Sequence, residues 1–210
     1  MPRPDAFVLP KLTPMRPFVL PPTRLRGFSL GPPARRAHYR VFSVSESTVT
    51  APDGSSRAPV YTLDCADWCN VVAITEDDEL VLVRQLRFGT REITLELPGG
   101  MLDAEEDPAA GALRELREET GYDAPRAEPL LVVRPNPSLQ GNRLHAFVAR
   151  GARLVHATEF DEHEDCETVL VPIEHVPRLL DEGHMSHALC VVVLERLLRT
   201  GAASAGTSTR

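Results

Sequence analysis

Three glutamates at helical spacing are the residues of this sequence best suited to chemistry. Glu115, Glu118 and Glu119 lie three and four residues apart in the stretch GALRELREETGYD, so in a helix they would share one face. Like charges placed in this way destabilise a helix by roughly 0.2–0.5 kcal/mol per pair. A hard divalent cation such as Mg²⁺ takes carboxylate oxygens as ligands and would offset that repulsion. From the helix alone, a solvated acidic face is the more usual explanation.

The residues around the glutamates define the helix that must position them. Asp107 followed by Pro108 supplies an N-cap and a first-turn residue. Gly121 is well placed to end the helix in a left-handed conformation. The sequence therefore predicts a helix from 108 to about 120. The apolar stripe that would face the core consists of Ala109, Ala112, Leu113 and Leu116.

The remaining pattern predicts a mixed α and β domain, an α+β fold. The β-rich runs, separated by turn residues, occupy 38–44, 59–64, 70–75, 79–87, 92–98, 129–135, 144–150 and 167–173. Two more helices are expected over 174–183 and 186–199. Because strands outnumber helices and are often adjacent in sequence, we expect a mixed sheet between helices instead of a regular βαβ repeat.

Both ends of the chain are expected to lie outside this domain. Nine of the 19 prolines fall in residues 1–37, which predicts a flexible extension without regular structure. A transit peptide, or a start codon placed too early with Met15 as the alternative, would also explain this segment. Residues 201–210 lack apolar anchors and are expected to form a disordered tail. The predicted organisation is thus an extension (1–37), one domain (38–200) and a tail (201–210).

Composition and charge narrow the class of protein. No apolar run reaches the roughly 18–20 residues that span a bilayer, so a membrane role is not expected. The net charge is −7 and residues 1–37 carry +6; the acidic remainder argues against a nucleic-acid-binding surface. The four cysteines form no CxxC pair, which favours reduced thiols and a cytoplasmic location. The histidine spacings match no zinc pattern.

The residues that flank the glutamates extend the pattern at fixed spacing. Gly100 is followed after five residues by Glu106. After seven more residues comes the run Arg114-Glu115-Leu116-Arg117-Glu118-Glu119-Thr120-Gly121-Tyr122. This pattern resembles the Nudix box, GX5EX7REUXEEXGU, at every specified position, and a looser similarity covers roughly residues 58–198. The resemblance implies a loop-helix-loop catalytic motif at 100–122, held in an α/β/α sandwich. It also implies hydrolysis of a nucleoside diphosphate linked to another moiety.

The resemblance also implies roles for single residues. Carried over by position, the ligands of Mg²⁺ or Mn²⁺ would be the carboxylates of Glu115, Glu118 and Glu119 and the carbonyl of Gly99. A pyrophosphate would be repelled by clustered carboxylates unless metal ions bridge the two. Glu118 and Arg114 are expected to serve catalysis, Arg114 by orienting the glutamates through ion pairs. Glu106 is expected to support the loop, although Arg114 and Glu106 could be purely structural ion pairs.

The stretch VRQLRFGTREITLELPGG looks like the ADP-ribose pyrophosphatase branch, with its Gln-x-Arg strand and Glu-Leu-Pro-(Ala or Gly)-Gly segment. Arg87 is then the first candidate for contacting the substrate, and the weaker candidates are Arg84, Gln85 and Arg91. Pro137 lies near the position of a proline in a Pro-Gly loop of this branch. Ser138 stands where a glycine is common, so GDP-mannose or another nucleotide sugar stays open as the substrate.

The acidic loop EFDEHEDCE is where this branch often supplies a glutamate as the general base. Glu164 is the first candidate, and Glu162 and Glu167 are alternates. The branch commonly forms homodimers, so a homodimer acting on a small nucleoside diphosphate is expected. A dinucleotide, coenzyme A or an oxidised nucleotide are alternative substrates. A non-catalytic nucleotide-binding module is a further alternative, although a pure sensor need not keep the three glutamates.

Overall fold

The computed structural model describes residues 20–23, 25, 27–160 and 165–201. Eleven strands and three helices are assigned in this part of the chain. The elements are β1 (Ser29–Leu30), β2 (Ala34–His38), β3 (Ser43–Thr50), β4 (Ser56–Asp64), β5 (Trp68–Thr75), β6 (Glu79–Arg87), β7 (Glu92–Glu96), α1 (Pro108–Thr120), β8 (Tyr122–Asp123), β9 (Ala127–Val133), β10 (Leu144–Leu154), β11 (Cys166–Pro172), a 3₁₀ turn (Ile173–His175), α2 (Val176–Asp181) and α3 (Ala188–Thr200).

The main sheet has seven strands in the order β11-β6-β5-β10-β8, with β7 paired to β6 and β9 paired to β10. β5 and β10 run parallel, whereas the other paired strands of this sheet are antiparallel. The predicted mixed sheet is therefore confirmed. In the described chain, no helix is long and apolar enough to cross a membrane.

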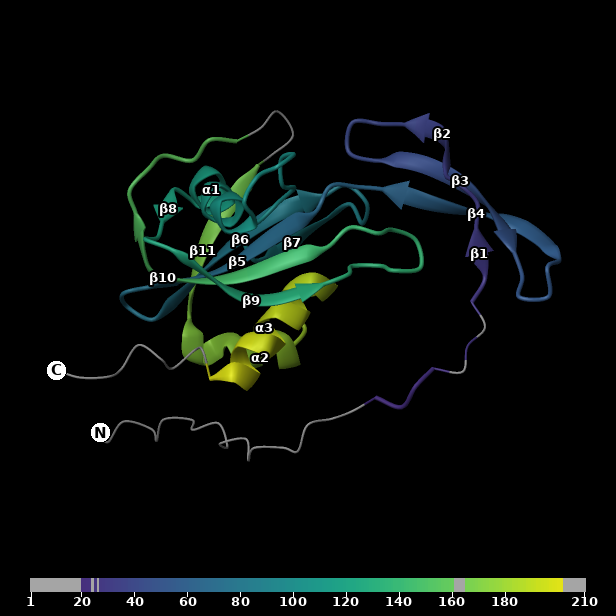
Figure 1. Ribbon diagram of the computed structural model, residues 1–210. Helices are drawn as coiled ribbons and strands as arrows, with labels where there is room; N and C mark the ends of the chain where they lie inside the picture. The colour runs from purple at the N-terminus through teal and green to yellow at the C-terminus, as the bar shows by residue number, and fades with distance from the viewer. Residues whose placement is uncertain (1–19, 24, 26, 161–164, 202–210) are drawn as a thin grey trace.

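Helices cover both faces of the main sheet (Figure 1). On one face, Val71 of β5 belongs to the core cluster that contains Leu116 of α1. On the other face, Val72 packs in the cluster that contains Leu194 of α3. Because successive side chains of a strand point to opposite faces, β5 supplies both cores. The observed layers confirm the expected α/β/α sandwich.

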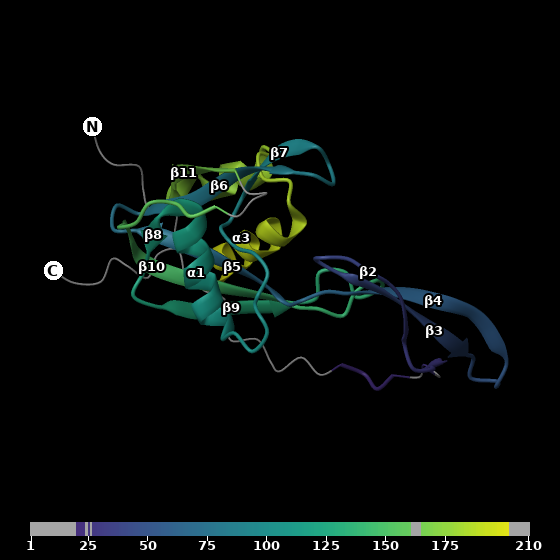
Figure 2. The same ribbon diagram turned by 90° about the horizontal axis from the view of Figure 1, so that it is seen from above.

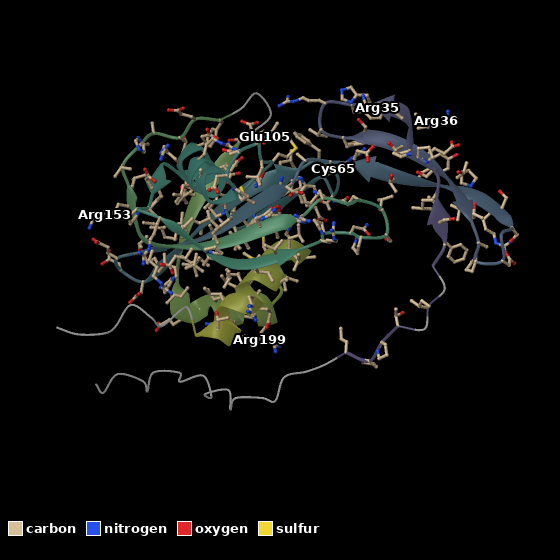
Figure 3. The ribbon with its side chains drawn as sticks, viewed as in Figure 1. Arg35, Arg36, Cys65, Glu105, Arg153 and Arg199 are labelled. Atoms are coloured by element: carbon tan, nitrogen blue, oxygen red, sulfur yellow. The ribbon has the colours of Figure 1, made fainter. Side chains whose placement is uncertain are left out.

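A smaller sheet, built from β1 to β4, projects from the body of the molecule (Figure 2). β3 pairs with β1, β2 and β4, all antiparallel. Cys65 lies where the chain leaves β4 and enters the main sheet (Figure 3). The expectation that residues 1–37 lack regular structure is wrong for β1 and most of β2. The last proline of the N-terminal segment is Pro33, so residues 34–38 can donate backbone hydrogen bonds to β3.

Most elements match their predicted ranges. The helix expected over 108–120 and the strand expected over 79–87 have the predicted bounds. The run 38–44 is not one strand, because a turn closed by a hydrogen bond from the Tyr39 amide to the Phe42 carbonyl (2.9 Å) divides it between β2 and β3. The helix expected over 174–183 is shortened to α2, which is preceded by a 3₁₀ turn.

Candidate active site

Helix α1 is capped at both ends by the residues that predicted it. The Asp107 side chain accepts hydrogen bonds from the amides of Ala109 and Ala110, both at 3.0 Å. Gly121 ends the helix in the left-handed conformation, with φ of 73°, and its amide donates to the Arg117 carbonyl. Such caps satisfy backbone groups that a helix leaves without intrahelical partners. The caps therefore hold the glutamate face at a defined place over the sheet.

Arg114 is the hub that gathers the charged side chains of the motif. Its Nε and Nη2 donate to the two carboxylate oxygens of Glu106, at 2.9 and 3.1 Å. Its Nη1 donates to both Glu115 (3.0 Å) and Glu118 (2.8 Å), and Nη2 also reaches the Met101 carbonyl at 3.3 Å. The hydrogen bonds to Glu106, against the cost of burial, raise the pKa of Arg114. A permanently charged guanidinium thus aligns two of the three glutamates.

The loop before α1 presents the backbone of Gly99 to the third glutamate. The neighbouring carbonyls of Pro98 and Gly100 accept hydrogen bonds from β5 amides, each at 2.9 Å. The Gly99 amide donates to Glu119 Oε2 at 2.9 Å. The backbone of Gly99 therefore lies in direct contact with the third glutamate.

The two glycines are needed because the loop lies very close to its neighbours. A Cβ on Gly99 would collide with the Cys69 carbonyl, and its φ of 154° lies outside the range that other residues favour. A Cβ on Gly100 would lie 2.6 Å from Glu115 Oε1. Glu115 and Glu119 are only 7% and 3% exposed. The loop and the two buried carboxylates are thus packed directly against each other.

The donor set of this site fits a hard divalent cation. It consists of carboxylate oxygens and one backbone carbonyl, which are the ligands that Mg²⁺ and Mn²⁺ prefer. Burying two carboxylates is costly unless positive charge compensates them. The Glu118 side chain is 35% exposed, so it is the member of the trio most open to solvent and substrate. The residues present therefore match the implied metal site.

Arg87 is held by a buried carboxylate that the sequence analysis overlooked. Its Nε and Nη2 donate to the two oxygens of Glu96 at 2.7 and 2.6 Å, and Thr94 donates to Glu96 Oε1 at 2.5 Å. Burial of Glu96 opposes its ionisation, but the Arg87 and Thr94 hydrogen bonds outweigh burial and hold its pKa below the usual value. The pKa of Arg87 is raised chiefly by its hydrogen bonds to Glu96, and Glu119 adds a smaller electrostatic contribution.

The remaining candidates on β6 divide between the two faces of the sheet. Gln85 shares the face of Arg87, since side chains two apart along a strand point the same way, and its buried Nε2 has no hydrogen-bond partner. Arg84 points to the other face, where it lines a pocket beside Leu179 and pairs with Glu167 at 3.1 Å. The structure therefore brings Gln85 and Arg87 to the site, but not Arg84 or the alternate base Glu167.

The other candidates lie in two loops, one between β9 and β10 and one before β11. Pro137 is exposed in the loop between β9 and β10, a loop whose Leu139 carbonyl accepts from the Leu63 amide at 2.9 Å. Glu162 and Glu164 lie outside the described residues. The segment leading to them contacts the C-terminal end of α1, where the Glu159 amide donates to the Glu118 carbonyl at 2.8 Å.

Replacing Arg87 by Leu is expected to lower the free energy of unfolding at pH 7 by about 3 kcal/mol, because Glu96 would keep a buried charge without its partner. Chemical denaturation measures this value. Arg84→Leu on the same strand is the control, since its pair with Glu167 is exposed and is worth at most about 1 kcal/mol. Equal losses for the two variants would contradict the buried role of the Arg87 pair.

The stabilisation by this pair should also depend on pH. The folded-state pKa of Glu96 is lowered, so its contribution is fully present above the unfolded pKa of about 4.3 and is lost as the pH falls through the folded value. The difference in stability between wild type and Arg87→Leu should therefore shrink in acid. A difference that stays constant down to about pH 2 would exclude this linkage.

Glu96 was the main residue that sequence reasoning missed. The signal for it in the sequence is a single acid within the otherwise apolar end of EITLELPGG. A buried carboxylate of this kind needs a cationic partner. Asn70 was also missed, and its buried amide lies 3.5 Å from the carbonyls of Leu97 and Pro98.

Comparisons with known proteins agree with this geometry. A family model described as the NUDIX domain matches residues 69–191. The ADP-ribose pyrophosphatase of Bacillus subtilis is 29% identical over 128 residues, which are 60% of this chain and 69% of that protein. The CMP-5'-(N-acetyl-N-hydroxy-3-aminopropyl)phosphonate hydrolase of Streptomyces rubellomurinus is 31% identical over 171 residues, covering 78% of this chain and 79% of that protein.

A solved structure supports the fold. A crystal structure of an ADP compounds hydrolase superposes with a TM-score of 0.76 at 23% identity, covering 89% of this chain and all of that one. The matched domain contains the whole of α1 and the glycine loop before it. Together with the capped carboxylate helix, the Arg114 ion pairs and the glycine loop bonded to Glu119, these matches establish that the chain belongs to the Nudix family and is a Nudix hydrolase.

Proposed function

We propose that this protein hydrolyses ADP-ribose or a related nucleoside diphosphate sugar to a nucleoside monophosphate and a sugar phosphate. The observation that carries the proposal is the arrangement around α1. Arg114 joins Glu115 to Glu118, while the Gly99 amide holds Glu119. This arrangement supports a metal-dependent reaction at a diphosphate. We further propose that residues 38–200 form the catalytic domain and that the protein acts in the cytoplasm.

The metal is proposed to be Mg²⁺ or Mn²⁺, held by Glu115, Glu118, Glu119 and the Gly99 carbonyl. Bound there, the ion supplies neutralisation of the diphosphate charge and polarisation of the phosphorus attacked by water. Arg114 fixes the rotamers of Glu115 and Glu118 and is itself held by Glu106. Glu164 is proposed to accept the proton of the attacking water, as the described part of its loop contacts the C-terminal end of α1.

Arg87 and Gln85 are proposed to contact the substrate from the sheet. Two donors of Arg87 are used by Glu96, but a guanidinium has further N–H groups that can bind a phosphate oxygen. The unpartnered Nε2 of Gln85 offers a second donor on the same face. Pro137 is proposed to border the substrate from the β9–β10 loop. One relative is named for ADP-ribose and another for a CMP-linked phosphonate, so the substrate must be tested directly.

A panel assay tests the proposed reaction. The purified protein is incubated with Mg²⁺ and, in separate reactions, ADP-ribose, GDP-mannose, NADH, diadenosine polyphosphates, coenzyme A and an oxidised nucleotide. Products are identified by mass, with AMP and ribose phosphate expected from ADP-ribose. Cleavage of another member alone would replace the substrate but keep the chemistry. Binding without cleavage of any member would support a nucleotide-binding module instead.

We also propose that the protein forms a homodimer through its projecting sheet. This sheet has exposed apolar side chains, among them Val60 and Tyr61 of β4 and Leu30 of β1. It extends from the body without a covering layer of helices in the described chain (Figure 2). Exposed apolar surface of this kind is typical of an interaction site, and a second copy would cover it.

Sedimentation velocity is expected to give twice the chain mass of 23.1 kDa. Val60→Asp should shift the protein toward the monomer, because a carboxylate would be buried in the interface. Val192→Asp, on the exposed side of α3, is the matched control and should leave the dimer intact. A monomeric wild type, or equal dissociation of both variants, would contradict the proposed interface.

A further inference from the structure

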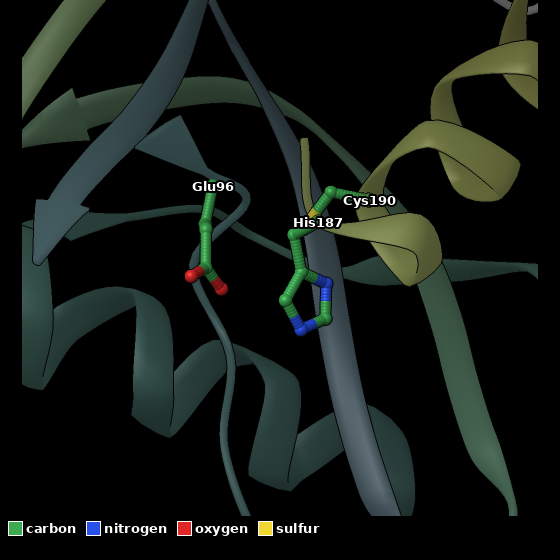
Figure 4. A group of neighbouring side chains, drawn as sticks. All are labelled: Glu96, His187 and Cys190. Atoms are coloured by element: carbon green, nitrogen blue, oxygen red, sulfur yellow. The ribbon is translucent and has the colours of Figure 1, made fainter. Parts of the chain in front are cut away.

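A second cluster of potential metal ligands lies beside the glycine loop. It consists of Glu96, His187 and Cys190, and one ligand atom from each lies within 4.8 Å of the other two. Figure 4 shows the imidazole of His187 beside the Glu96 carboxylate, with Cys190 on the next part of α3. The cluster is distinct from the carboxylates of α1. We call these three residues the soft-ligand cluster.

The fold brings this cluster together from two distant segments. His187 is the N-cap residue of α3, and Cys190 follows three positions later, so both side chains lie on the same side of the first turn. The Leu97 amide donates to Cys190 Sγ at 3.4 Å, which anchors α3 to the end of β7. Glu96, next to Leu97, is thereby placed against the helix start. Sequence spacing alone could not reveal this arrangement.

The chemistry of the cluster differs from that of the α1 site. A thiol, an imidazole and a carboxylate are the usual protein ligands of Zn²⁺, whereas Mg²⁺ avoids sulfur and nitrogen. Glu96 and Cys190 are buried, and the buried Nδ1 of His187 has no hydrogen-bond partner. Ligands of a tetrahedral zinc ion lie about 3.3–3.7 Å apart, as follows from bonds of about 2.0–2.3 Å. Side-chain rotations that move the ligand atoms by about an ångström would therefore bring all three within bonding distance of one zinc ion.

Arg87 is the competitor for this site, because its guanidinium already binds both oxygens of Glu96. Each carboxylate oxygen can accept more than one bond, so a cation can share Glu96 or draw it away from Arg87. With three protein ligands, the site would keep an open position, unlike the closed sites of structural zinc. Metal binding at this cluster is therefore expected to be reversible and not required for folding.

We propose that Glu96, His187 and Cys190 bind one borderline-soft divalent cation of the Zn²⁺ class, and that this binding perturbs the Arg87–Glu96 pair. Bonds form from the metal to Cys190 Sγ, one His187 nitrogen and a Glu96 oxygen, and the thiol proton is released to solvent. No electron transfer is involved. Because metal binding displaces the thiol proton, affinity should increase with pH.

Zn²⁺ bound at the soft-ligand cluster should also inhibit hydrolysis. This expectation rests on the proposed function, since it requires Arg87 to contact the substrate. A cation on Glu96 would change the position of Arg87 opposite the α1 carboxylates. Zn²⁺ added in the presence of saturating Mg²⁺ is then expected to inhibit hydrolysis. The binding of Zn²⁺ does not depend on this role and can be measured without any substrate.

The decisive experiment titrates the full-length protein with Zn²⁺ by calorimetry, in excess Mg²⁺ that occupies the α1 site. A parallel titration with Co²⁺ follows the thiolate-to-cobalt absorption band, which reports sulfur ligation. Cys190→Ser and His187→Gln should each weaken Zn²⁺ affinity by more than about 100-fold, above the loss typical of residues that only support a ligand. Cys65→Ser and His184→Gln are the matched controls and should bind as the wild type does.

Each outcome decides the proposal. One Zn²⁺ per chain, a cobalt–thiolate band, and loss of both in the two cluster variants would support it. No Zn²⁺ binding by the wild type, or unchanged binding in the folded His187→Gln variant, would overturn it. Thermal melting checks whether each variant is folded. If Cys190→Ser unfolds, the His187→Gln variant still tests the site, because His187 is partly exposed. Zn²⁺ binding without inhibition would support the metal site but exclude its effect on Arg87. If no member of the substrate panel were cleaved, the Zn²⁺ binding result would still stand.

Discussion

Glu118→Gln is expected to lower kcat for hydrolysis of the diphosphate substrate by about 1,000-fold. The substitution keeps the size of the side chain but removes the negative charge that we propose holds the divalent cation. Such a cation supplies several kcal/mol of charge stabilisation in reactions of this kind. Glu118 is also the glutamate of the trio most exposed to solvent. Its loss should therefore act on turnover much more than on the fold.

Steady-state kinetics over a range of Mg²⁺ concentrations measures this effect, together with a thermal melt. Arg114 keeps Glu106 and Glu115 as partners in the variant, so unfolding should occur near the wild-type temperature. Glu195→Gln makes the same chemical change on α3, where Glu195 pairs only weakly with Arg199 at 3.7 Å. A Glu118→Gln protein that turns over substrate as fast as this control would exclude the metal assignment.

Gly100→Ala is expected to reduce kcat/KM by about 100-fold. The added Cβ would lie 2.6 Å from Glu115 Oε1 and 2.8 Å from its Cδ, which is closer than van der Waals contact allows. Glu115 is buried and bonded to Arg114, so it cannot move without changing the carboxylate geometry. Displacement of a catalytic group by about 1 Å can cost about 100-fold in rate.

Gly141→Ala is the matched control for this variant, because a Cβ at Gly141 meets no atom within 4 Å. Its activity and its melting temperature should stay close to those of the wild type. If Gly100→Ala retained full activity, the close approach between the loop and Glu115 would not be needed for catalysis. If it failed only by unfolding, circular dichroism would separate that result from a damaged site.

The local parts of the site were predictable because their causes lie within a few residues. Asp107, Pro108 and Gly121 set the ends of α1 through hydrogen bonds and backbone preferences that act within one turn. The glutamate spacing follows from the period of the helix itself. The alternation of apolar residues likewise predicted the strands, with errors at 38–44 and at the proline-rich start, where pairing partners decide between strand and turn.

The sequence by itself determined the catalytic helix, its caps, the spacing of its charged residues and, through that spacing, the family. Only the tertiary structure decided which distant side chains meet. The order of the sheet places Arg87 on Glu96 and turns Arg84 to the opposite face. The docking of α3 brings His187 and Cys190 to the end of β7. Such contacts depend on strand register and on the packing of layers. A register shift of one residue would move every side chain of a strand to the other face of the sheet, and the spacing of residues within one segment does not determine the register.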